Sequence, residues 1–173
     1  MPTTAQPRIT SHQSTDAKHH VDALTYSGRR GLDDFLRQMY EATPMQTLET
    51  ERKGVSAAIL NELARRMELP TSYIAMALGI SKVTAHRKIA TGKLVDGRPI
   101  VGLVKLLALA QEIVDESTSS QAEHFDTVKW LGQWIVRPQP ALGGYKPAEL
   151  LDATTGITMV AKVLGAIRSG AYQ

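Results

Sequence analysis

Apolar side chains recur every three or four residues along most of the chain, which is the spacing of helices with one buried face. A helix is predicted over residues 31–40, where Asp33 and Asp34 occupy the first turn and complement the helix dipole. A second is predicted over residues 55–69; Pro70 ends it and Thr71 opens the next helix. The apolar positions of these two helices are Leu32, Phe35, Leu36 and Met39, then Val55, Ile59, Leu63 and Met67.

Residues 99–116 are apolar on nearly every side of a predicted helix, so this helix must be covered on several sides. We expect both the core and a second subunit to cover it, which makes it the candidate dimer interface. After a polar linker at 117–120, another helix is predicted, and Trp130 and Trp134 on it are expected to pack in the core or between helices. Its apolar stripe is Phe125, Val128, Leu131 and Ile135. The Arg-Pro-Gln-Pro segment at 137–140 breaks it.

The last part of the chain predicts two more helices, and no strand is predicted anywhere in the chain. A short one covers residues 147–151, and a longer one is capped by Thr154 or Thr155 and ended by Gly170. The apolar positions of the longer helix are Ile157, Val160, Ala161, Leu164 and Ile167. Residues 1–28 carry hardly a large apolar side chain, so they are predicted to form a flexible tail.

Composition supports an all-α fold, because 43% of the 173 residues are apolar but only 5% are aromatic. The chain has no cysteine, which excludes disulfides, thiolate metal sites and a cysteine nucleophile. No stretch approaches the roughly 20 apolar residues that cross a bilayer, and the opening residues lack a secretory core, so we expect a cytoplasmic protein. His19 and His20 have no third ligand nearby, so no metal site is expected. No motif indicates an enzyme or a cofactor.

Residues 71–91 have the pattern of a helix-turn-helix unit. Its inward positions are Ile74, Ala75 and Leu78 on the first helix, Ile80 after the turn, and Ala85 and Ile89 on the second helix. Ala75 is small where the helices cross, and Gly79 can adopt the left-handed conformation of a sharp reversal. Ser81 is placed to cap the second helix, which would enter the major groove of DNA.

The outward side chains of this second helix are rich in hydrogen-bond donors. The candidate DNA-binding residues are Ser81, Lys82, Thr84, His86, Arg87 and Lys88. Arg87 can fork onto a guanine edge and Thr84 can meet a thymine methyl group, whereas Lys82 and Lys88 suit phosphates.

Charge gathers in the same part of the chain. Residues 82–98 carry a net charge of +4, although the whole chain carries only +3. Such a patch is what phosphate contact needs, but a solvated helix face has the same composition. A structural helical hairpin is therefore the alternative to DNA binding. Lys88 favours that alternative, because many helix-turn-helix proteins bury an apolar side chain there and Ile89 must take its place.

The C-terminal third carries a distinctive motif. It consists of Trp130 and Leu131, the segment PQPALGGYKPAELLD at 138–152, the Thr-Thr-Gly at 154–156, a helix over 160–167, and the Gly-Ala-Tyr at 170–172. This motif resembles the toxin-binding domain of the Xre/MbcA/ParS antitoxin family. Residues 84–89 and 92–94 look more loosely like the second helix of that family and its exit.

The resemblance implies a toxin partner, usually of the RES-domain type, which degrades NAD or transfers from it. It also implies that the C-terminal segment of the antitoxin plugs the active-site cleft of the toxin. The candidate toxin-binding residues are Arg168, Ser169, Gly170, Ala171, Tyr172 and Gln173. A frayed helix end is the alternative interpretation of that segment. Gly143 and Gly144 are expected to form a tight turn, because no P-loop Lys-Ser/Thr follows them.

We therefore predict a tail (1–28), a helical domain with the helix-turn-helix (29–98), and a helical dimerisation and toxin-binding domain (99–173). The predicted function is that of a type II antitoxin that neutralises a RES-type toxin and represses its own operon. Its predicted partners are that toxin, operator DNA and a second copy of the chain. The alternatives are a toxin-binding protein with a degenerate helix-turn-helix and a plain transcriptional repressor.

Overall fold

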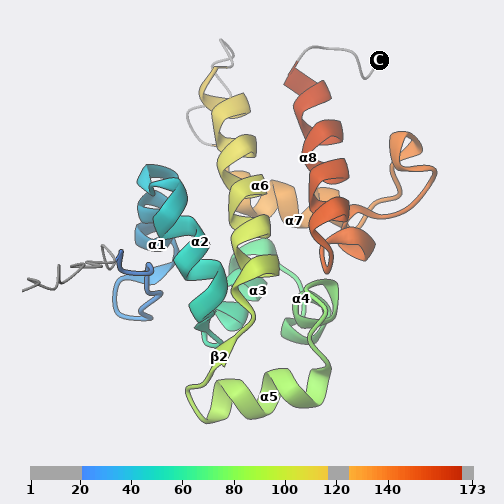
Figure 1. Cartoon of the computed structure of the whole chain (residues 1–173). Helices are drawn as coiled ribbons and strands as arrows, with labels where there is room; N and C mark the ends of the chain where they lie inside the picture. The colour runs from blue at the N-terminus through green and yellow to red at the C-terminus, as the bar shows by residue number, and fades with distance from the viewer. Residues whose placement is uncertain (1–20, 117–124, 169–173) are drawn as a thin grey trace, which may run out of the picture.

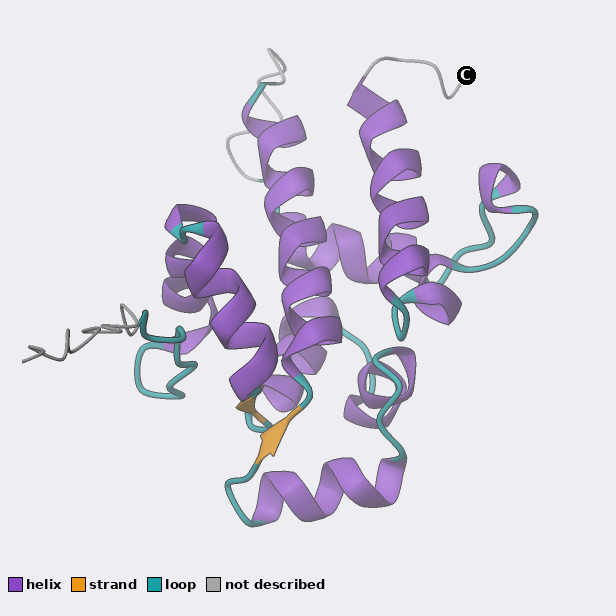
Figure 2. Cartoon of the chain, in the orientation of Figure 1, coloured by secondary structure: helices purple, strands orange, loops and turns teal. Residues whose placement is uncertain are grey.

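The computed structural model describes residues 21–116 and 125–168, and their arrangement is shown in Figures 1 and 2. The elements in chain order are α1 (Gly31–Glu41), α2 (Pro44–Lys53), β1 (Val55–Ser56), α3 (Ile59–Met67), α4 (Thr71–Ala77), α5 (Lys82–Ala90), β2 (Leu94–Val95), α6 (Gly97–Asp115), α7 (Thr127–Ile135), the 3-10 helices η2 (Pro140–Leu142) and η3 (Pro147–Leu150), and α8 (Thr154–Arg168). This confirms the all-α class. None of the described helices combines the length and apolarity needed to cross a membrane.

Helix α6 runs through the middle of the molecule, with α1 and α2 on one side and α8 on the other (Figure 1). Seven of its apolar side chains are at most 3% exposed: Ile100, Val101, Leu103, Val104, Leu106, Leu107 and Ala110. The prediction that this helix is covered on several sides is confirmed. Helices of the same chain already cover these side chains, so a dimer interface on this helix would have to use its other side chains and stays a prediction.

The predicted domain boundary between residues 98 and 99 falls within the first turn of α6. Buried side chains from α1 and α3 and from α6, α7 and α8 belong to one hydrophobic core. The division into two domains stays a prediction.

The chain before α1 is fastened to α2 and α1. Thr50 is completely buried, and its hydroxyl accepts the N–H of Leu24 at 2.9 Å and donates to the Gln46 carbonyl at 2.7 Å. The ring of Tyr26 meets Phe35 edge to face, with centroids 5.8 Å apart. The hydrogen bonds satisfy the buried Thr50 hydroxyl and the Leu24 N–H, and the ring contact buries Tyr26 against Phe35.

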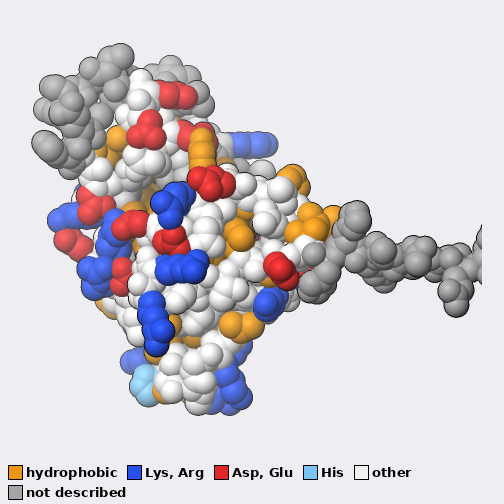
Figure 3. All heavy atoms as spheres, turned by 90° about the vertical axis from the view of Figure 1, so that its left-hand side faces the viewer, with side chains coloured by type: hydrophobic (Ala, Val, Ile, Leu, Met, Phe, Trp, Pro, Cys, Tyr) orange, Lys and Arg blue, Asp and Glu red, His pale blue; other side chains and the backbone are white. Residues whose placement is uncertain are grey.

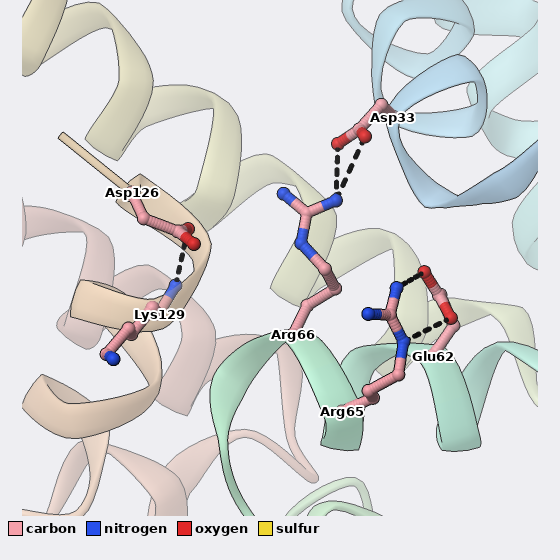
Figure 4. Close-up of polar contacts among 6 residues, drawn as sticks. All are labelled: Asp33, Glu62, Arg65, Arg66, Asp126 and Lys129. Carbon is pink, nitrogen blue, oxygen red and sulfur yellow. Dashed lines mark hydrogen bonds and ion pairs between the residues drawn. The ribbon is translucent and has the colours of Figure 1, made fainter. Parts of the chain in front are cut away.

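Ion pairs tie α3 to its surroundings (Figure 4). Arg66 donates to both carboxylate oxygens of Asp33 on α1, each at 2.9 Å. Within α3, the side chain of Arg65 donates to Glu62 and thereby lowers the pKa of that carboxyl group.

Helix α2 was not predicted from the apolar pattern, because little of its surface is apolar. Its N-terminus carries a capping box, in which the N–H of Gln46 donates to the Thr43 hydroxyl and the N–H of Thr43 donates to the Gln46 side chain. Pro44 follows the cap at the first helical position.

Two short strands correct the prediction that the chain has none. Val55 pairs with Val95 and Ser56 with Leu94 in an antiparallel ladder, and α3 begins only at Ile59. Val55 is buried as predicted, but in a strand rather than a helix. Pairing with β2 stabilises the extended conformation of these residues more than a local helical turn would.

Helix α7 begins at Thr127 and is capped by Asp126, whose carboxylate accepts the N–H of Lys129 at 3.0 Å (Figure 4). Val128, Leu131 and Ile135 are buried as predicted. Phe125 precedes the helix and is 41% exposed, so its place in the buried stripe was predicted wrongly.

The predicted short helix at 147–151 is the 3-10 helix η3. Helix α8 begins at Thr154, so neither Thr154 nor Thr155 precedes it as a cap. Its predicted apolar positions pack on the core, with Val160 and Leu164 fully buried. The predicted end at Gly170 lies outside the described residues.

Candidate nucleic-acid interface and partner-binding domain

Helices α4 and α5 are joined by the sharp turn that the sequence predicts. Gly79 has φ +72°, the left-handed conformation that glycine adopts without steric penalty. The N–H of Ile80 donates to the Ala75 carbonyl at 2.8 Å and folds the turn back onto α4. The inward residues Ile74, Ala75, Leu78, Ile80 and Ala85 are all buried. This two-helix unit therefore has the predicted shape.

Ser81 caps α5 as predicted. Its hydroxyl group accepts the N–H of Thr84 at 3.3 Å, and its O–H donates to the Thr84 hydroxyl oxygen at 2.9 Å. The cap fixes the N-terminus of the helix that would face DNA.

Lys88 is part of the scaffold rather than a free cation. It is half-buried, and its ammonium group donates to the Leu94 carbonyl of β2 at 2.7 Å. Ile89 is the residue that packs against the core, which confirms the predicted register of α5. The predicted phosphate contact by Lys88 stays a prediction, because the ammonium group keeps two further N–H donors beside the one given to the strand carbonyl.

The outward face of α5 is open. Lys82, His86 and Arg87 are exposed and Thr84 is half-buried. The helix lies along the lower edge of the molecule in Figure 1, where it contacts α4 and β2. Figure 3 shows Lys and Arg side chains at this lower tip. Within the described residues, the side chains of Lys82 and Arg87 have no ion-pair partner.

The basic patch is narrower than the charge count implies. Arg98 pairs with Asp96, with Nη2 and Oδ2 2.6 Å apart. This hydrogen bond holds the pKa of Asp96 below its ordinary value, and the N–H of Arg98 adds to the effect. Arg98 is therefore already neutralised within the chain.

Val83 is a candidate contact that was not predicted. It is 79% exposed on the first turn of α5, and Arg87 lies on the same face one turn later. An exposed apolar side chain between donors fits the methyl group of thymine. The sequence could have indicated this contact, because Val83 precedes Arg87 by four residues and lies on the outward side of the predicted helix.

In the C-terminal motif, the segment after Pro138 forms a closed turn. The N–H of Gln139 donates to the Tyr145 carbonyl and the N–H of Gly144 donates to the Gln139 carbonyl, both at 3.0 Å. Gly143 and Gly144 have φ +66° and +85°, and Leu142 is buried beneath them. The prediction of a tight turn is confirmed.

The two tryptophans of α7 pack against the core, as predicted, but are only half-buried. Trp130 and Trp134 stack with centroids 6.1 Å apart, and Phe125 lies 6.0 Å from Trp130. Leu131, which lies between the two tryptophans in the sequence, is completely buried.

Most of the predicted toxin-binding segment lies outside the described residues. Arg168 is the last residue of α8, whereas Ser169, Gly170, Ala171, Tyr172 and Gln173 follow it. His19 and His20 also lie outside. In the described ranges, no group of three or more His, Asp or Glu side chains could hold a metal ion.

Comparison with known proteins identifies the C-terminal motif. Residues 122–170 match the antitoxin Xre/MbcA/ParS C-terminal toxin-binding domain. The Prs ADP-ribosylating antitoxin of Sphingobium sp. (strain YBL2) is 31% identical over 139 residues, which cover 79% of this chain and 86% of that protein. The chain belongs to the Xre/MbcA/ParS antitoxin family.

The toxin-binding domain of this antitoxin thus comprises α7, η2, η3 and α8, and its match ends close to the end of α8. The likeness to the Sphingobium antitoxin is much longer than this domain, so it must also cover residues upstream of it.

Proposed function

We propose that this antitoxin binds operator DNA through α5 and neutralises an NAD-consuming toxin of the RES type through its C-terminal segment. The DNA-binding part rests chiefly on one observation: a capped helix after a left-handed glycine turn presents unpaired donors on an outward face. Arg87 forks onto a guanine edge, Val83 and Thr84 meet thymine methyl groups, and Lys82 contacts a phosphate. His86 is exposed on the same helix and is the remaining candidate contact.

The toxin-binding part rests on the family and on the name of its Sphingobium relative. ADP-ribosylation draws its ADP-ribose from NAD, so an NAD-consuming enzyme is the partner that this name supports. Arg168, Tyr172 and Gln173 would enter a cleft shaped for a charged dinucleotide. A homodimer would read two half-sites about 34 Å apart.

Binding to the DNA upstream of the operon tests the first part, with a scrambled duplex as the competitor. Arg87→Ala is expected to weaken specific binding by about tenfold or more, because a bidentate contact to guanine is lost. Arg87→Lys keeps the charge but not the fork, so it should lose sequence preference and retain salt dependence. Lys162→Ala removes an exposed charge on α8 and serves as the control. Unchanged affinity and preference in Arg87→Ala would refute the role of α5.

Co-expression with the toxin encoded in the same operon tests the second part. The full chain is expected to preserve cellular NAD, whereas a chain that ends at Arg168 should still bind the toxin but let NAD fall. Tyr172→Ala should give an intermediate loss of protection. If the shortened chain protects cells fully, the C-terminal segment does not occlude the active site.

A second candidate function is toxin binding alone, with a degenerate helix-turn-helix. The observation in its favour is Lys88, whose ammonium group donates to a carbonyl of the scaffold at a position where many helix-turn-helix proteins bury an apolar side chain. Absence of binding to the upstream duplex, both with and without toxin, would select this function.

A further inference from the structure

Cationic side chains surround a hollow of about 610 Å³ between the C-terminus of α2, the exit of α5 and β2. Its charged lining comprises Glu51, Arg52, Lys53, Lys88, Asp96 and Arg98, so cations outnumber acids. Lys93 lies in the turn that connects α5 to β2, next to this rim.

Close backbone contacts fix the end of α2 against this turn. A Cβ atom on Gly54 would stand 2.4 Å from the Val95 carbonyl oxygen, so only glycine fits there. The N–H of Ala57 donates to the Lys93 carbonyl at 3.0 Å. The position of Lys53, the last residue of α2, is therefore rigidly related to the end of α5.

Most of the cations around the hollow already have partners. Arg52 pairs with Glu49 at 2.9 Å, Arg98 pairs with Asp96, and Lys88 donates to a carbonyl. Lys53 and Lys93 are both exposed, and within the described part of the chain neither ammonium group has a hydrogen bond or an ion pair.

We propose that Lys53 and Lys93 bind phosphates of the DNA strand that borders the groove occupied by α5. A helix in the major groove is flanked by sugar-phosphate backbones, and cations beside the helix neutralise phosphates without reading sequence. In Figure 1, α5 runs along the lower edge from α4 to β2, and the end of α2 lies beside β2. Figure 3 shows Lys and Arg side chains on this face above the tip.

This inference rests on the proposed DNA-binding function. The other explanation of Lys53 is that it stabilises α2, since a cation in the last turn complements the helix dipole. If Lys53 had only that role, Lys53→Ala would change the stability of the protein and would leave the salt dependence of DNA binding unchanged.

The test measures binding of the full chain to the upstream duplex and to a scrambled duplex between about 50 and 200 mM salt. Lys53→Ala and Lys93→Ala should each reduce the slope of log K against log salt by about 0.9 and weaken binding about fivefold, equally for both duplexes. The double variant should show both losses, Lys53→Arg and Lys93→Arg should restore the slope, and Lys162→Ala should match the wild type. Thermal unfolding of each variant accompanies the titration.

Three outcomes overturn the inference. If the wild type binds neither duplex, the proposed DNA-binding function fails and this inference fails with it. If Arg87→Ala loses sequence preference but the double lysine variant keeps the full slope, only the phosphate contacts are refuted. If Lys53→Ala lowers the melting temperature and leaves the slope of log K against log salt unchanged, Lys53 stabilises α2 and does not contact DNA.

Discussion

Gly132 of α7 lies directly against Met67 of α3. A Cβ atom on Gly132 would stand 2.4 Å from the Met67 carbonyl oxygen and 2.6 Å from the Met67 Cβ, closer than real Cβ contacts come. Gly132→Ala must therefore push α7 away from α3, and we expect it to lower the free energy of unfolding by about 2–3 kcal/mol in urea denaturation.

Gly165 in α8 is the matched control for Gly132, because it is also a helical glycine but a Cβ atom there would meet nothing within 4 Å. Gly165→Ala should raise the free energy of unfolding by up to about 1 kcal/mol, since alanine loses less backbone entropy on folding. Equal effects of the two substitutions would contradict the close approach of α7 and α3.

Thr50 is expected to stabilise the fold through its hydroxyl group. Thr50→Val keeps the shape but removes the acceptor of the Leu24 N–H, which should lower the free energy of unfolding by about 1–3 kcal/mol. Hydrogen exchange at the Leu24 amide should accelerate. Thr158→Val, at an exposed threonine of α8, should change stability by less than about 0.5 kcal/mol. Slow exchange in Thr50→Val would disprove the contact.

Ser81 should contribute about 1 kcal/mol through its cap on α5, so Ser81→Ala should lower the melting temperature. Asparagine caps helices as well as serine does, so Ser81→Asn should keep most of that stability. If the two variants melt together below the wild type, the hydroxyl acts in some way other than capping.

Asp96 should make stability depend on pH. Its pKa is lowered in the folded chain because the Arg98 side chain donates to its carboxylate. The stability from this charge is therefore fully present above the ordinary aspartate pKa of about 4 and is lost as the pH falls through the lowered value. Urea denaturation should show wild type and Asp96→Asn differing at pH 7 and converging under acid. A pH-independent difference would contradict the role of the charge.

The turn between α4 and α5 could be predicted because its signals are local. Pro70, Gly79 and Ser81 act within one or two helical turns, through backbone conformations that each residue type prefers. The turn at Gly143 and Gly144 was predictable for the same reason.

What depends on distant partners could not be predicted. β1 forms because Val55 meets Val95 far along the chain, and Lys88 finds its acceptor only after the chain has turned into β2. The apolar surface of α6 indicated burial, but no pattern in that helix says whether its own chain or another covers it. α2 was missed because only its cap, at Thr43 and Gln46, marks it.

The central place of α6 bears on how a cell can discard this protein. The helix holds α1 and α2 on one side and the toxin-binding helices on the other. Cleavage of α6 in a chain that has opened by local unfolding would remove the shared support of both flanks at once. Under the proposed function, such degradation would end both the repression of the operon and the inhibition of the toxin in one irreversible step.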